Sequence, residues 1–267
     1  MYKKGEVSLY NLPMAREVVK YNNKLNTLTF HNFTENEMKL FFALVAKMRN
    51  HGTEEVTFSF SDIKKLTHEK KNYTKLEYAD LMSSMHDKMV DLHYKYNLED
   101  GVRGRFNLFY AYGIDPNEES IKVSVSPQFQ SLLNDLAKEF TRFELEEFIR
   151  LRGKYTKQIY RLLKQWRTVG HFSCLMKDFR ELVDVPDKYN TAELTRRVLD
   201  PAIDKLKEIY AFRNLKYEYS YKGHKPIRII FHWNPELVDY EGRESTKYLE
   251  KEWKKDDAEI MSDLLWK

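Results

Sequence analysis

Two stretches of the chain share one order of hydrophobic and polar patterns. In the first, Thr34 to Glu37 has the Ser/Thr-x-x-Glu spacing that caps a helix, and apolar residues follow at intervals of three and four. A short alternating segment, a short helical pattern, a second capping sequence at Thr74 to Glu77 and a long helical pattern come next. The spacing then changes towards two, which predicts strands over 93–97, 105–112 and 121–126. Helix, strand, two helices and a hairpin in this order are typical of a winged helix.

The second stretch repeats this order. Helical spacing runs over 143–168, with a break expected at Gly153, and a short strand pattern and a short helix over 177–183 follow. Thr191 is placed to cap a long helix that reaches to about Tyr210. Two alternating segments joined at 222–225 then predict a hairpin. Pro201 lacks an amide hydrogen, so a kink is expected there, beyond the first turns of the helix.

The two halves also share local sequence. Asp62-Ile63-Lys64-Lys65-Leu66 is followed after six residues by Tyr73, and Asp178-Phe179-Arg180-Glu181-Leu182 is followed after six residues by Tyr189. Together with the shared order of elements, this predicts an internal repeat. The expected fold is α+β, with two tandem winged-helix domains in a pseudo-repeat. The predicted boundaries are an N-terminal domain over 1–130, a C-terminal domain over 131–235 and an acidic tail over 236–267.

Charge is unevenly distributed along the chain. The net charge is +4, but from Glu236 to the end there are ten acidic and six basic residues, which leaves +8 on residues 1–235. A basic body favours an anionic partner, and nucleic acid is the commonest one. No apolar run approaches the roughly 20 residues of a membrane-spanning helix, and no signal-type segment follows the N-terminus, so the chain is expected in the cytoplasm without a membrane partner.

The sequence offers little for catalysis. It has no Gly-x-x-x-x-Gly-Lys phosphate loop, no histidine pair at metal-ligand spacing and a single cysteine, which predicts no cofactor, no metal site and no enzymatic activity. Tyr160 and Lys164 form a Tyr-x-x-x-Lys pair, as in nicking initiators that use a tyrosine nucleophile. Such enzymes also need a histidine pair for their metal, so we favour the interpretation of these two residues as part of a helix surface.

Cations gather between Phe148 and Lys177, where no acidic residue occurs. Lys157, Arg161 and Lys164 are spaced to share one helix face, opposite an apolar stripe. This favours a phosphate backbone as the occupant, because solvated faces usually interleave both signs. Weaker candidates lie in the second hairpin tip and in the turn before Thr74. The predicted backbone contacts are Arg150, Arg152, Lys154, Lys157, Arg161, Lys164, Lys222, His224, Lys225, Lys70, Lys71, Asn72, Tyr73 and Lys75.

The long helix of the second half is the candidate for base reading. Arg pairs with guanine edges, Asn with adenine, and Glu accepts from cytosine, and the first turns of a recognition helix enter the major groove. Adjacent helical residues point about 100° apart, so one of two neighbouring arginines is expected to read a base and the other to grip backbone, and the sequence leaves open which. The predicted base-reading residues are Lys188, Tyr189, Asn190, Thr191, Glu193, Arg196 and Arg197.

Three stretches of the second half carry a family likeness. They are residues 155–166, residues 178–182 and, most specifically, Arg196-Arg197-Val198-Leu199-Asp200-Pro201-Ala202-Ile203. They resemble iteron-binding, theta-type plasmid replication initiators, and the likeness spans about residues 15–233. In that family the last stretch corresponds to the recognition helix.

The resemblance implies a set of partners and activities. It implies monomers that bind direct repeats in double-stranded DNA at a plasmid origin and help to melt adjacent A/T-rich DNA. It implies dimers, formed through the first domain, that repress the protein's own gene or limit copy number, and it implies partners among the host replication proteins. Two alternatives stay open: a plasmid transcriptional repressor with the same fold, and a nicking enzyme that uses Tyr160.

Overall fold

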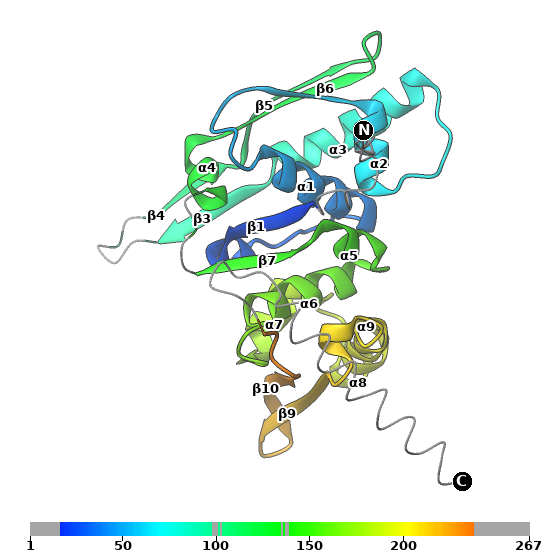
Figure 1. Ribbon diagram of the computed structural model, residues 1–267. Helices are drawn as coiled ribbons and strands as arrows, with labels where there is room; N and C mark the ends of the chain where they lie inside the picture. The colour runs from blue at the N-terminus through cyan, green and yellow to red at the C-terminus, as the bar shows by residue number, and fades with distance from the viewer. Residues whose placement is uncertain (1–16, 98–100, 102, 135, 137–138, 238–267) are drawn as a thin grey trace, which may run out of the picture. The chain divides into compact units, whose positions relative to one another are not determined.

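The computed structural model describes residues 17–97, 101, 103–134, 136 and 139–237, which form two compact units (Figure 1). The first unit ends at Arg152 and the second begins at Gly153, later than the predicted boundary after residue 130. The reason is that β7 (Phe140–Glu144) pairs with β1 (Val18–Asn22), so backbone hydrogen bonds tie this segment to the first unit. The predicted acidic tail lies outside the described residues from position 238 on. No helix of the described part is long and apolar enough to cross a membrane.

The first unit contains a winged helix. Its helices are α1 (Glu35–Met48), α2 (Phe60–Thr67) and α3 (Lys75–Val90). Its sheet has the order β2–β6–β5, built from β2 (Val56–Ser59), β5 (Phe109–Asp115) and β6 (Ser120–Val125), and the β5–β6 hairpin is the wing. The capping boxes predicted at Thr34 and Thr74 are both present, with each hydroxyl accepting from the amide three residues on.

A second sheet and further helical segments complete the first unit. They are the β1–β7 pair, a 3-10 turn (Asn23–Thr27), α4 (Pro127–Leu133) and α5 (Leu145–Arg150). Aromatic rings from these segments and from α1 form the core. The Phe42 ring lies 4.7 Å from that of Phe148 and 5.9 Å from that of Tyr21, and all three are fully buried. Such contacts add to the free energy gained by burying the rings.

The predicted strand 105–112 is in fact two strands in different sheets. β4 (Arg103–Asn107) pairs only with β3 (His93–Asn97), whereas β5 pairs with β6. Leu108 separates β4 from β5. Its side chain is fully buried, its amide donates to the Leu92 carbonyl, and its carbonyl accepts from Ser126. The alternating sequence pattern gives no sign that the backbone changes partners at Leu108.

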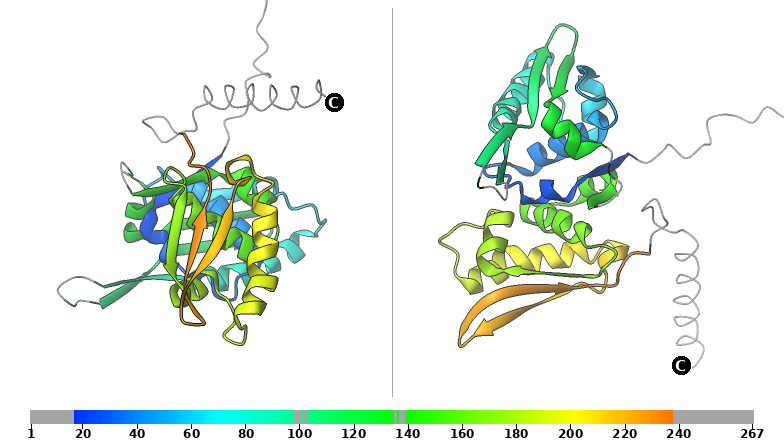
Figure 2. Two further views of the ribbon diagram at one scale, coloured as in Figure 1. Left: turned by 90° about the horizontal axis from the view of Figure 1, so that it is seen from below. Right: turned by 90° about the vertical axis from the view of Figure 1, so that its left-hand side faces the viewer.

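The second unit is a winged helix of the same topology. It contains α6 (Lys154–Gln165), β8 (His171–Leu175), α7 (Met176–Val183) and a long helix made of α8 (Thr191–Leu194), a π-helical turn (Thr195–Leu199) and α9 (Asp200–Leu206). A 3-10 turn (Tyr210–Phe212), β9 (Lys216–Lys222) and β10 (Lys225–His232) follow, and the sheet order is β8–β10–β9. Figure 2 shows the β9–β10 hairpin in orange, beside the α8–α9 helix in yellow.

The internal repeat holds residue by residue around the second and third helices. The residue that follows α2 is His68 and the residue that follows α7 is Asp184, and both adopt the left-handed conformation, with φ of 52° and 56°. The next helix begins after Thr74 in one unit and after Asn190 in the other, with a capping-box glutamate three residues later in each. Each pair is 116 positions apart (68 and 184, 74 and 190). The predicted repeat and fold class are therefore confirmed, although the second cap is Asn190 and not Thr191.

Candidate nucleic-acid interface

The turn before the long helix of the second unit presents Lys188, Tyr189 and Asn190. Lys188 is exposed and Tyr189 is half-buried. Asn190 Oδ1 accepts from the Glu193 amide at 2.9 Å, and Glu193 Oε2 accepts from the Asn190 amide at 3.1 Å. Both side chains therefore fix the start of the helix, which leaves them fewer free atoms for a base edge than the sequence suggested. Thr191, at the first helical position, is half-buried.

A π-helical turn, Thr195–Leu199, interrupts the helix where bases are expected to be read. The Asp200 amide donates to the Thr195 carbonyl, five residues back. The next residue, Pro201, has no amide hydrogen, and a proline ring crowds the carbonyl four residues before it, here that of Arg197. The wider turn accommodates this conflict. The predicted kink beyond the reading turns is thus wrong, because the irregular turn itself carries the two arginines.

The two arginines of the π-helical turn are both exposed but differ in their surroundings. The Arg197 guanidinium lies 5.4 Å from the centre of the Tyr189 ring, and its Nε lies 3.8 Å from Glu193 Oε1. Arg196 has no comparable partner among the described residues. These contacts restrict the Arg197 side chain before any ligand arrives, so it loses less conformational entropy on binding than Arg196 does.

The wing of the second unit ends in a cationic tip. Lys222, His224 and Lys225 are all exposed there. Between them Gly223 has a φ of +61°, a conformation that a two-residue hairpin turn demands and that glycine adopts without strain. The tip therefore places two lysines and a histidine on one tight turn, a surface that suits phosphate oxygens.

The first unit has a comparable cationic turn before α3. Lys70, Lys71, Asn72 and Lys75 are exposed, and Tyr73 is half-buried. The Lys71 ammonium lies 4.8 Å from the centre of the Tyr73 ring. Lys75 Nζ is 2.7 Å from Glu119 Oε1 on the wing, so part of its charge is already neutralised by the protein.

The two units differ in charge at equivalent places. Asp80 occupies the position in α3 that Arg196 occupies in the second unit, again 116 positions apart (80 and 196). The β5–β6 wing tip carries three carboxylates, whereas the β9–β10 tip carries two lysines and a histidine. The three are Asp115, Glu118 and Glu119. Because carboxylates repel phosphate, the second unit is the stronger candidate for reading DNA.

The cationic face predicted on α6 is buried. Lys157 and Arg161 are 0% exposed and Lys164 is 2% exposed. Lys164 Nζ lies 2.6 Å from Glu236 Oε1, and Arg167 lies 3.9 Å from the other oxygen of the same carboxylate. Buried side chains do not reach a phosphate. The predicted backbone contacts of Lys157, Arg161 and Lys164 are therefore wrong. The sequence around α6 does not show this burial, because the carboxylate that pairs with Lys164 comes 72 residues later.

The remaining predicted cations around α5 and α6 lie nearer the surface. Arg150 forms an ion pair with Glu146 one helical turn earlier, and Arg152 is exposed. Lys154 is half-buried, with its Nζ 3.0 Å from Asp184 Oδ2. Arg150 and Lys154 thus already have carboxylate partners, which weakens them as backbone candidates.

Tyr160 is fully buried, which overturns its interpretation as a helix-surface residue. Its ring packs edge-on against Phe212 at 6.0 Å, and the Lys164 ammonium lies 5.5 Å from the ring centre. A tyrosine nucleophile has to reach a phosphodiester, and this hydroxyl is enclosed by the protein. Within the described ranges, no group of three His, Cys, Asp or Glu side chains is placed to hold a metal ion.

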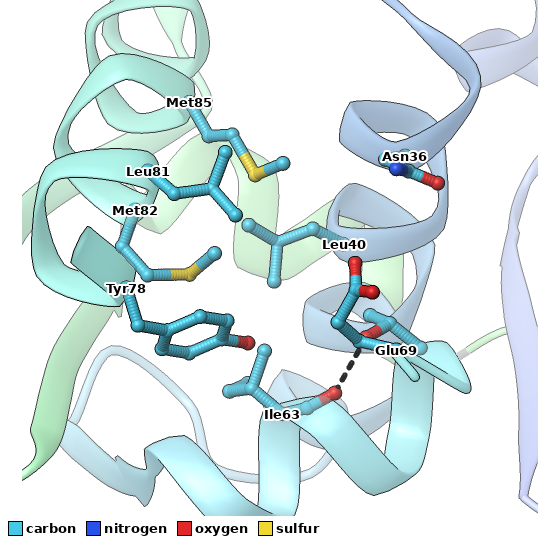
Figure 3. A pocket seen from close by; sticks show the side chains of 9 residues that line it. Asn36, Leu40, Ile63, Glu69, Tyr78, Leu81, Met82 and Met85 are labelled. Carbon is cyan, nitrogen blue, oxygen red and sulfur yellow. Dashed lines mark hydrogen bonds between the residues drawn. The ribbon is translucent and has the colours of Figure 1, made fainter. Parts of the chain in front are cut away.

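A small pocket lies between α1, α2 and α3 (Figure 3). Five of its nine lining residues are leucines, methionines or an isoleucine, and the one charged group in the lining is the carboxylate of Glu69. Thioethers and leucines beside a carboxylate suit apolar contacts and repel phosphate. This pocket therefore has the opposite chemistry to the cationic turns.

A cationic ribbon in the first unit was missed by the sequence prediction. Lys95 on β3 lies directly opposite Arg105 on β4, and Arg103 is two residues away on the same strand. All three side chains are exposed. The sequence does show Arg103 and Arg105 alternating with other residues along β4. This cationic strand was overlooked because 105–112 was predicted to be one strand.

Two family models match this sequence. The model described as Initiator Replication protein, WH1, matches residues 18–164, and the one described as Initiator Rep protein, WH2, matches residues 175–233. The chain belongs to the initiator replication protein family. This membership confirms the family suggested by the motifs, and it confirms two winged-helix domains. The WH1 match runs beyond Arg152 and includes α6, which the packing of the structure places in the second unit.

Two individual proteins support this family membership and this fold. A relative described as "Probable replication protein rep" of Bifidobacterium longum (strain NCC 2705) is 31% identical over 231 residues, which are 85% of this chain and 76% of the relative. The crystal structure of Pi initiator protein in complex with iteron DNA superposes with a TM-score of 0.62 at 14% identity, and covers 82% of this chain and 97% of that one. At 14% identity, the likeness to the Pi initiator protein shows a shared fold.

Proposed function

We propose that this protein initiates plasmid replication by binding iterons, tandem direct repeats in double-stranded DNA at the origin. The observation that carries the proposal is the exposed pair Arg196 and Arg197 in the early turns of the second unit's helix, in a unit whose wing tip is cationic. Arginines so placed can meet base edges in the major groove. Membership of the initiator family supports the assignment, and the Pi protein of the same fold was solved with iteron DNA.

Arg196 and Arg197 are assigned different roles because their surroundings differ. Arg197, restrained by Tyr189 and Glu193, reads a base, and Arg196 grips the backbone. Lys188, Asn190 and Thr191 flank this contact. The wing tip and the cationic turn of the first unit bind phosphates through Lys222, His224, Lys225, Lys70, Lys71, Asn72 and Lys75.

The resemblance to the family supports further activities of the proposed initiator. Bound monomers help to open A/T-rich DNA and recruit host replication proteins in the cytoplasm, without a catalytic residue or cofactor. Dimers form through the first unit and limit copy number. Support for self-association comes from β5, the outer strand of its sheet, where Tyr110 is 82% exposed.

The test of the function is binding to the DNA around the gene. Tandem repeats of about 20 base pairs beside an A/T-rich stretch should bind more tightly than scrambled repeats of equal composition, because a two-unit reader spans roughly two helical turns. Titration at several salt concentrations would measure this preference. Binding confined to one inverted repeat over the promoter would instead support the transcriptional repressor.

The wing tip offers a quantitative prediction. Replacing Lys222 and Lys225 together with Gln should weaken binding to repeat DNA and to random DNA by the same factor. The slope of log affinity against log salt should become shallower by about 0.9 for each phosphate that the variant no longer neutralises. Lys207→Gln, an exposed lysine at the end of α9, is the control and should leave the slope unchanged. An unchanged slope in the double variant would remove the wing tip from the interface.

The nicking alternative predicts a covalent product. Incubating the protein with supercoiled origin DNA and a divalent metal ion is expected to yield neither relaxed circles nor a protein–DNA adduct, because the Tyr160 hydroxyl is buried. A gel after protease treatment detects either product. Relaxation that disappears in Tyr160→Phe would establish the enzyme and contradict the proposed function.

A further inference from the structure

The wing of the second unit is hydrogen-bonded to both ends of the π-helical turn. The Tyr217 hydroxyl donates to Asp200 Oδ1 at 2.7 Å, just after the turn. The Tyr219 hydroxyl and the Thr195 hydroxyl are 2.9 Å apart, at the first residue of the turn. Both tyrosines come from one face of β9, two residues apart, and their rings meet edge-on at 5.8 Å. The strand that leads to the cationic tip therefore holds the irregular turn at its first residue and just past its last.

We infer that Tyr217 and Tyr219 are positioning residues that set the direction in which Arg196 and Arg197 leave the helix. The inference rests on the proposed function and adds to it a connection between the wing and the reading turn. π-Helical turns are rare, and they occur frequently at functional sites. Removing either hydrogen bond would let the turn relax, which would move the guanidinium groups relative to the base edges.

The two bonds differ in strength. Tyr217 donates to a carboxylate, and charge-assisted bonds of this type are shorter and stronger than neutral ones. Burial raises the pKa of Tyr217, and its hydrogen bond to Asp200 raises it further, so the phenol keeps its proton and stays a donor. Burial also raises the pKa of Tyr219. The Tyr219–Thr195 bond joins two hydroxyls, and either can donate.

Positioning by hydroxyl groups makes a specific prediction for binding. Tyr217→Phe and Tyr219→Phe keep the rings and their packing but lose the bonds. Each should weaken binding to repeat DNA by about three- to tenfold, as expected for one hydrogen bond, and leave binding to random DNA within about twofold. The measurement is the ratio of the two affinities, because a general loss of folded protein would lower both.

Matched variants identify the cause of any change. Tyr221→Phe removes a hydroxyl from the same face of β9, farther towards the tip, and should keep the ratio of affinities. Asp200→Asn retains an oxygen acceptor and should keep most of the specificity, whereas Asp200→Ala should lose as much as Tyr217→Phe. Thr195→Val removes the partner of Tyr219 and a hydroxyl that also interacts with Tyr217, so it should lower the ratio at least as much as Tyr219→Phe.

The outcomes separate this inference from the proposed function. If the unaltered protein binds repeats no better than random DNA, the proposed function fails. If the unaltered protein discriminates but both Phe variants keep its ratio of affinities, or if Tyr221→Phe lowers the ratio equally, the positioning role is overturned and the proposed function stands.

Discussion

Replacing Glu236 with Ala is expected to destabilise the second unit by about 3 kcal/mol. The reason is that its carboxylate, 5% exposed, is the partner of Lys164 at 2.6 Å and lies 3.9 Å from Arg167, and both cations are buried. Removing one member of a buried ion pair leaves an uncompensated charge in a region of low polarity, which costs more than the pair contributes. Hydrogen exchange of the β9 and β10 amides in the full chain would measure the loss.

The control for Glu236→Ala is the same substitution at an exposed glutamate. Glu208→Ala removes an exposed glutamate of the same unit and should change the free energy of unfolding by less than about 0.5 kcal/mol. The double variant Lys164→Met with Glu236→Leu should recover part of the loss, because it removes both charges together. Exchange rates in Glu236→Ala equal to those of the unaltered chain would contradict the assigned ion pair.

Replacing Arg197 with Ala is expected to weaken binding to repeat DNA by about 1–3 kcal/mol and to relax the preference at one base pair. The guanidinium is held by the Tyr189 ring and by Glu193, so its geometry is set before DNA arrives. Arg196→Ala should weaken repeat and random DNA alike, with a smaller salt slope, because this side chain is free to follow a phosphate. Affinities for single-base variants of the repeat, at two or more salt concentrations, separate these effects.

Two further variants sharpen the assignment of Arg197. Arg197→Lys keeps the charge but loses the planar fork, so it should bind random DNA normally and still lose base preference. Tyr189→Phe keeps the ring under the guanidinium and should retain that preference. The assignment would be reversed if Arg196→Ala lost base preference while Arg197→Ala lowered all affinities equally.

The sequence predicts those features that depend on neighbouring residues. The capping boxes at Thr34 and Thr74 mark helix starts because both partners lie within four positions, and the wing of the second unit follows from strict alternation. Features that depend on distant partners were not predictable. Lys164 looked exposed because Glu236 is remote in sequence. The π-helical turn has hydrogen-bond partners 17 and 24 residues away on the wing, and a helical pattern does not distinguish it from a regular turn.

The opposite charges of the two wing tips make the two units unequal. Its units share a frame offset by 116 positions (68 and 184), yet one hairpin tip carries carboxylates and the other carries lysines. A reader whose two units differ in charge fits a non-palindromic site in one orientation only. Under the proposed function, every copy bound to a row of identical repeats would then face the same way, so the two sides of the array would differ.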